Sequence, residues 1–87
     1  MTPTLVLLNP HAGGGRAGRL RQPLEQWLAQ HAPQVQLATP DTAQLARDRL
    51  QRLPAHSRVV VVGGDGTLNQ LLAPLLLGQH TLGLVPC

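Results

Sequence analysis

Short apolar runs alternate with stretches of helical periodicity along the whole chain. Runs typical of strands occur four times, at residues 4–8, 34–38, 59–62 and 81–85. Between them, leucine recurs three and four residues apart, as on the buried side of an amphipathic helix. This regular alternation predicts an α/β fold of Rossmann-like order, β-α-β-α-β-α-β, with a parallel sheet.

The predicted first helix carries its apolar residues on one face, at Leu20, Leu24, Trp27 and Leu28. Proline lies inside two of the helical patterns. Pro23 should kink the first helix or mark a late first turn, and Pro74 should bend the third helix or end it early. The third helix is expected over residues 67–77, with Gly78 as its C-terminal stop.

A turn at residues 39–42 precedes the predicted second helix. Asp41 or Thr42 can cap this helix, and Gln44 stands three residues after Asp41, as in a capping box. The apolar stripe of the helix then continues until Pro54 stops it.

A glycine-rich turn follows the third predicted strand, with glycine at positions 63, 64 and 66. Glycine allows a positive φ and lets the backbone approach a ligand closely. Because a helical pattern follows, free N–H groups and the helix dipole point at this turn, which suits a phosphate. The Asp65-Gly66 pair is also frequent in hairpin turns, but a second strand would then be expected.

Ligands of parallel sheets bind beyond the carboxyl ends of the strands. Residues 9–15, Thr39 and residues 63–69 all lie just past such ends. We therefore expect three separate loops to converge on one rim of the sheet.

The first loop also matches the GxGxxG pattern of dinucleotide-binding folds, at residues 13–18. Two features oppose that interpretation. Four residues separate the first strand from the glycines, and Asp41 is displaced beyond a proline from the place where a ribose-binding acid is expected. A P-loop is excluded because it needs a lysine and the chain has none.

Composition narrows the classes of partner. The chain has 87 residues, enough for one small domain, and a net charge of +3, with all seven basic charges on arginine. Aromatic residues make up 1%, so stacking platforms for nucleic acid are missing and no nucleic-acid partner is expected.

Cys87 stands alone and the four histidines are scattered, which gives no disulfide or zinc pattern. With no signal peptide or spanning segment recognisable, a cytoplasmic chain is expected.

The segment Gly-Gly-Asp-Gly-Thr-Leu-Asn at residues 63–69 resembles the signature of the diacylglycerol kinase-like lipid kinases. Its first five residues also occur in NAD kinases and, slightly altered, in phosphofructokinases. The Asn-Pro-x-x-Gly element at residues 9–13 looks like the opening of the lipid kinase catalytic domain. Thr39 and residues 82–86 fall where that family has comparable residues, so the resemblance covers essentially the whole chain.

The resemblance implies an ATP site with Mg²⁺. Asp65 would lie near the phosphates and their metal ion, as the catalytic and candidate metal-binding position, although a turn-forming role is the alternative. The implied nucleotide-binding residues are Asn9, Pro10, His11, Ala12, Gly13, Thr39, Gly63, Gly64, Asp65, Gly66, Thr67, Leu68 and Asn69. For Asn9 and Thr39 a purely turn-forming role remains open.

Lipid kinases of this family continue with Gly-Thr-x-Asn-Asp and a second, mostly β domain, whereas this sequence stops at Cys87. The resemblance thus implies that residues 1–87 are the N-terminal, nucleotide-binding part of an ATP-dependent lipid kinase and are inactive alone. The general base and the contacts with a membrane lipid would belong to the second domain, with peripheral membrane association. An NAD kinase-like enzyme and a non-catalytic nucleotide-binding fragment are the alternatives, and a homodimer remains open.

Overall fold

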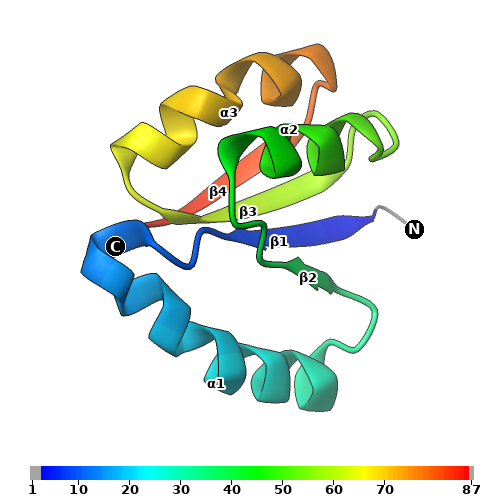
Figure 1. Ribbon diagram of the computed structural model, residues 1–87. Coiled ribbons are helices and arrows are strands. Elements are labelled where there is room, and N and C mark those ends of the chain that lie inside the picture. The colour runs from blue at the N-terminus through cyan, green and yellow to red at the C-terminus, as the bar shows by residue number, and fades with distance from the viewer. Residues whose placement is uncertain (1–2, 87) are drawn as a thin grey trace.

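The computed structural model describes residues 3–86, so Cys87 lies outside the described residues. Strands and helices alternate as expected, and the α/β fold with a parallel sheet is confirmed (Figure 1). The elements in chain order are β1 (Thr4–Leu8), the 3-10 turn η1 (Ala12–Gly15), α1 (Arg16–His31), β2 (Gln36–Ala38), α2 (Ala43–Gln51), β3 (Arg58–Gly63), α3 (Asp65–Leu77) and β4 (Thr81–Pro86). None of the described helices is both long and apolar enough to cross a membrane.

The sheet has the order β2-β1-β3-β4, and all three pairings are parallel. Helix α1 covers one face, while α2 and α3 lie side by side on the other (Figure 1). This arrangement follows from right-handed crossovers: the chain steps one way from β1 to β2 and then back across β1 to β3 and β4.

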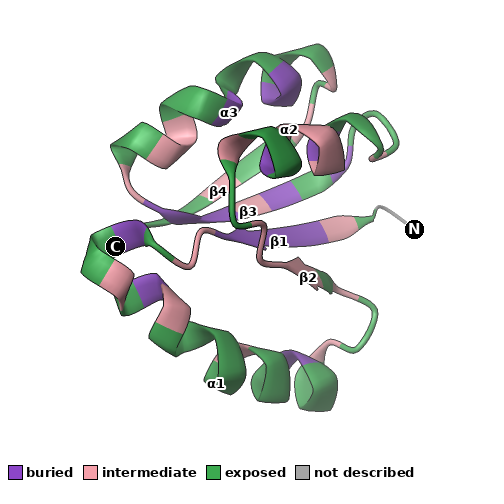
Figure 2. Ribbon diagram, viewed as in Figure 1, coloured by how far each residue is buried: buried purple, intermediate pink, exposed green. Residues whose placement is uncertain are grey.

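Two apolar clusters, one on each face of the sheet, form the core (Figure 2). Leu5, Leu7, Val59 and Val61 point toward α2 and α3, where Leu50, Leu71 and Leu75 pack on them. Val6, Leu8 and Val62 point the other way, toward Ala17 and Leu28 of α1. The central strands β1 and β3 therefore contribute to both layers, as their continuous apolar runs predict.

The prediction for α1 was only partly right. Leu28 is buried and Leu24 packs against the cluster under α1, but Leu20 is exposed and Trp27 is 54% exposed. Trp27 stacks on His31 instead, with ring centroids 4.6 Å apart. A single helix on this face covers only part of a four-stranded sheet, so residues on the edge of its stripe have nothing to pack against.

Helix boundaries differ from the predictions by two residues. Helix α2 ends at Gln51, before Leu53, and α3 begins at Asp65 rather than at position 67. Both prolines lie inside their helices: α3 runs past Pro74 to Leu77, and Pro23 lies well beyond the first turn of α1. An early end of α3 and a late first turn of α1, one of the two alternatives for each proline, are therefore excluded, and the predicted end of α3 at residue 77 is confirmed.

Thr42, not Asp41, caps α2: its hydroxyl oxygen accepts a hydrogen bond from the Leu45 N–H at 3.1 Å. The predicted capping box does not form, because Gln44 donates to Asp48 at 2.8 Å along the helix surface. Asp41 thus has no part in ending or starting a helix.

The predicted stop of α3 at Gly78 is confirmed, since the helix ends at Leu77 and Gly78 is its C-cap residue, with φ −80°. The residue with the left-handed backbone is Gln79, with φ 54°, and the Gln79 and His80 N–H groups bond back to Leu76 and Leu75 as in a Schellman motif. Gly78 makes room instead: a Cβ there would lie 2.2 Å from the His80 ring, whose Nδ1 accepts the Ser57 N–H.

Candidate functional site

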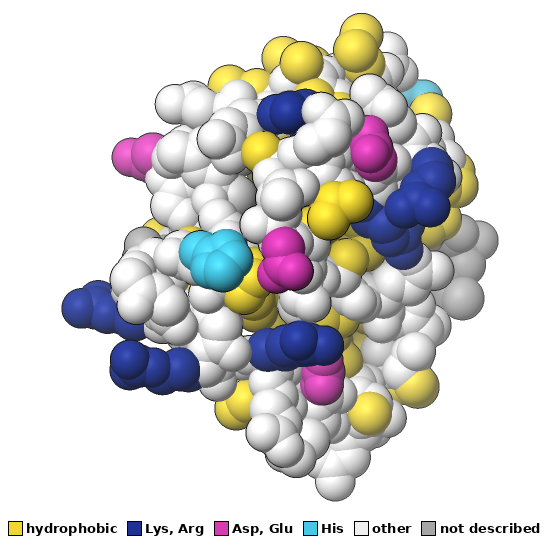
Figure 3. Space-filling view, viewed as in Figure 1, with side chains coloured by type: hydrophobic (Ala, Val, Ile, Leu, Met, Phe, Trp, Pro, Cys, Tyr) yellow, Lys and Arg dark blue, Asp and Glu magenta, His cyan; other side chains and the backbone are white. Residues whose placement is uncertain are grey.

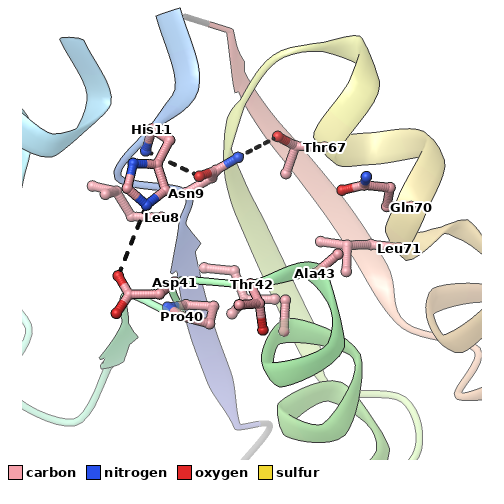
Figure 4. Close-up of a pocket in the computed structure, with 12 residues that line it drawn as sticks. Leu8, Asn9, His11, Pro40, Asp41, Thr42, Ala43, Thr67, Gln70 and Leu71 are labelled. Carbon is pink, nitrogen blue, oxygen red and sulfur yellow. Dashed lines mark hydrogen bonds and ion pairs between the residues drawn. The ribbon is translucent and has the colours of Figure 1, made fainter. Parts of the chain in front are cut away.

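The loops after β1 and β3 meet at the carboxyl edge of the sheet. Leu8 is in register with Val62, so both strands end at the same level. Just beyond them, the Asn9 side-chain N–H donates to the Thr67 hydroxyl at 2.8 Å, across 58 residues of sequence (Figure 4). This contact confirms that the two loops converge on one rim.

The loop after β1 is held by the backbone and side chain of Asn9. The backbone N–H of Asn9 donates to the Val62 carbonyl at 3.1 Å, and its side-chain oxygen accepts a hydrogen bond from the His11 backbone N–H at 3.0 Å. Its carbonyl accepts the Ala12 N–H at 3.1 Å and so closes the turn around Pro10. Asn9 therefore forms the turn, and the same side chain reaches the second loop.

Positive φ angles occur in the first glycine loop, not in the second. Gly13, Gly14 and Gly15 have φ of 63°, 66° and 94°. Gly18, the next glycine, lets α1 approach this loop, since a Cβ there would lie 2.8 Å from the Pro10 carbonyl oxygen.

The turn after β3 uses ordinary backbone angles, so its glycines do not adopt the positive φ that glycine allows. Gly64 is extended, with φ −105°, and α3 begins at the next residue. The short connection needs no left-handed residue because the strand leads directly into the helix. Gly63 serves clearance: a Cβ would lie 3.1 Å from the Thr67 Cβ and hydroxyl oxygen. A Cβ at Gly66 would meet nothing within 4 Å.

Asp65 is the first residue of α3, and its side chain is exposed at the rim. A carboxylate in the first helical turn interacts favourably with the helix dipole. The first N–H groups of a helix lack intrahelical partners, so the start of α3 offers free donors beside one carboxylate. Leu68 packs against the core and so presents only its backbone at the rim, whereas the side chain of Asn69 is exposed.

A cavity of about 200 Å³ opens beside these loops (Figure 4). Its walls are Leu7, Leu8, Asn9, His11, Pro40, Asp41, Thr42, Ala43, Ala46, Thr67, Gln70 and Leu71. Three of the sequence-predicted residues, Asn9, His11 and Thr67, line it. Thr39 does not, although the two residues that follow it do.

The turn after β2 contributes to this cavity, in line with the predicted convergence of three loops, whereas the sequence patterns did not predict the contributions of the helices α2 and α3. Pro40 and Asp41 follow β2 at the same rim, so their position after a strand end was the sequence feature that indicated a place at the site. Ala46 and Leu71 line the cavity together because α2 and α3 pack on each other, a contact that no local pattern predicts.

One ion pair spans the mouth of the cavity. His11 Nε2 lies 4.0 Å from an Asp41 carboxylate oxygen, and the two side chains are 71% and 79% exposed (Figure 4). Such an exposed pair contributes little to stability. On the face shown in Figure 3, arginine, acidic and histidine side chains are interspersed.

Within residues 3–86, no three His, Cys, Asp or Glu side chains come close enough to hold a metal ion by themselves. Mg²⁺ in phosphoryl-transfer sites is commonly held by one or two carboxylates together with substrate phosphates. Asp65 beside the free N–H groups of α3 fits that kind of shared coordination.

The family model of the diacylglycerol kinase catalytic domain matches residues 3–87. The matched segment includes both loops that meet at the rim. Neither the search of curated proteins nor that of solved structures found a match.

Proposed function

This chain belongs to the diacylglycerol kinase catalytic domain family, and we propose that it forms the ATP-phosphate side of a lipid kinase. The complete enzyme transfers the γ-phosphoryl group of ATP to a hydroxyl group of a lipid. The observation that carries this proposal is the Asn9–Thr67 hydrogen bond, because it joins the two motifs of the family at one rim of the sheet.

The start of α3 is suited to the phosphates of ATP. Its unpaired N–H groups and the dipole of a 13-residue helix attract negative charge, and Gly66 leaves open space for close approach. The first loop, from Asn9 to Gly13, stands opposite and forms the other wall.

Asp65 is the residue that would hold Mg²⁺, together with the phosphates of the nucleotide. When bound, the ion neutralises charge on the phosphates during transfer. Asp65 supplies the carboxylate and keeps the nucleotide in one orientation, while Thr67 and Asn9 fix the loops around it.

Phosphoryl transfer depends on groups placed on both sides of the reacting phosphate. We assign one side to this chain. The base that accepts the proton of the lipid hydroxyl, and the surface that holds the lipid, lie outside these 87 residues. The chain therefore binds Mg-ATP but does not phosphorylate lipid by itself.

Thermal unfolding of the 87-residue chain with Mg-ATP tests the binding step. A ligand at 100 times its dissociation constant stabilises the folded state by about 2.7 kcal/mol, so the melting temperature should rise. Asp65→Asn should weaken Mg-ATP binding roughly tenfold, because a charged contact is lost. Asp48→Asn, the same change on the α2 surface, is the matched control and should bind normally.

No shift with Mg-ATP, or equal shifts for wild type and Asp65→Asn, would contradict the proposal. Lipid phosphorylation by the purified 87-residue chain would contradict the division of roles. With a complete enzyme, transfer of phosphate to NAD rather than to a lipid would favour the NAD kinase-like alternative.

A further inference from the structure

Asp41 lies at the mouth of the cavity with no structural task that explains its position. It comes from the turn between β2 and α2, and Figure 4 shows its carboxylate beside the ring of His11, across the cavity from Gln70. Thr42 caps α2 in its place. Within residues 3–86, no hydrogen bond to the Asp41 carboxylate is found, and its one ion pair is the contact with His11 at 4.0 Å.

We propose that Asp41 accepts hydrogen bonds from the ribose hydroxyls of the nucleotide, so that the site favours ribonucleotides over 2′-deoxyribonucleotides. This inference rests on the proposed function, since it places a nucleotide in the cavity. An ionised carboxylate only accepts hydrogen bonds and has two oxygens, which matches the two hydroxyl donors of a ribose.

The shape of the cavity agrees with this placement. Small-molecule pockets usually measure roughly 300–1,000 Å³, and this cavity of about 200 Å³ is smaller. It therefore accommodates part of a nucleotide rather than the whole. Leu7, Ala46 and Leu71 form an apolar wall on which a base can pack, and the first turn of α3, which carries Thr67, places the phosphates at the other end.

The topology supports the same role. In doubly wound folds that bind dinucleotides, an acidic residue at the end of the second strand binds the ribose hydroxyls. By sequence position alone, Pro40 displaces Asp41 from that place. The structure removes this objection, because Pro40 and Asp41 both line the cavity.

The contact with His11 leaves the Asp41 carboxylate free to bind a ligand. The pair is exposed and spans 4.0 Å, so it is weak enough for Asp41 to turn toward a ligand. The loops that carry the two residues follow β1 and β2, which are neighbours in the sheet. Asp41 is thus held at the rim on the side where the nucleoside would lie.

The test compares Mg-ATP with Mg-2′-deoxy-ATP by titration calorimetry on the 87-residue chain. Because a hydrogen bond to a charged group is stronger than one between neutral groups, wild type should bind ATP at least roughly tenfold more tightly than 2′-deoxy-ATP. Asp41→Asn and Asp41→Ala should bring this ratio close to one. The ratio is the decisive quantity, because removing a negative charge strengthens binding of both nucleotides alike.

Asp48→Asn removes the same charge from α2, away from the cavity, and should keep the wild-type ratio. Thermal unfolding of each variant without nucleotide shows that the fold is retained. Equal affinity of wild type for the two nucleotides overturns this inference and leaves the proposed function standing. A ratio that Asp41→Asn leaves unchanged also overturns it, and no binding of ATP by wild type overturns both.

Discussion

The two glycine loops at the rim look alike in sequence and differ in what their glycines do. The loop after β1 contains three consecutive residues with positive φ, at positions 13, 14 and 15. The loop after β3 has none of these angles; Gly63 leaves room for Thr67, and Gly66 faces open space. The loop after β1 therefore needs glycine for its backbone angles, and the loop after β3 needs glycine at position 63 because Thr67 lies close to it.

The number of glycines in a loop therefore does not show whether they serve the backbone angles or the space around them. Both loops reverse the chain between a strand and a helix that runs back along the sheet. The first does so with left-handed angles at three glycines, whereas the second uses the single residue Gly64 in an extended conformation. In the second loop, Gly63 keeps space free for Thr67, and Gly66 faces open space.

The largest effect is expected for Gly63→Val. The added Cβ would lie 3.1 Å from Thr67, whose hydroxyl is tied to Asn9 and cannot give way freely. Overpacking of this kind costs about 1–3 kcal/mol, and urea unfolding should show a loss of about 2–3 kcal/mol.

Gly83→Val in β4 is the control, because a Cβ there meets Val60 at an ordinary 3.5 Å. Replacing Thr67 by alanine in the Gly63→Val background should restore part of the lost stability. If the double variant loses more free energy of unfolding than the two single variants lose together, Gly63 does not serve to leave room for Thr67.

A smaller loss is expected for Gly14→Ala in the first loop. A Cβ at this position meets nothing within 4 Å, so the cost comes from the backbone angle alone, with φ 66°. That cost is about 1–2 kcal/mol in the free energy of unfolding. Gly14→Asn should lose less, because asparagine tolerates left-handed angles. Equal losses for the two variants would show that some other property of Gly14 matters.

The smallest effect on stability is expected for Gly66→Ala. This residue lies in α3 with negative φ and open space around its Cα, and alanine favours helix over glycine by up to about 1 kcal/mol. The melting temperature should stay the same or rise. The rise produced by Mg-ATP should disappear, because the methyl group occupies the space where phosphates approach. If Mg-ATP raises the melting temperature of the variant as much as that of wild type, Gly66 is not part of the phosphate site.

Much of the fold was predictable because its signals are local. β1 was predicted to the residue, and the continuous valine run indicated a central strand. The convergence of the three loops after β1, β2 and β3 also followed, since parallel strands place their carboxyl ends on one edge. The element boundaries of β2, α2 and α3 were less accurate, because caps and turns shift them by one or two residues.

The apolar periodicity and the two motifs are enough by themselves to indicate a parallel α/β sheet and the diacylglycerol kinase family. Those features depend on neighbours in the chain. The exposure of Trp27, the conformations of the glycines and the arrival of Asp41 at the cavity depend on residues far away. They follow from how many helices cover each face of the sheet and from where α2 meets α3. These contacts join segments that are remote in sequence, so they are determined only when the chain folds.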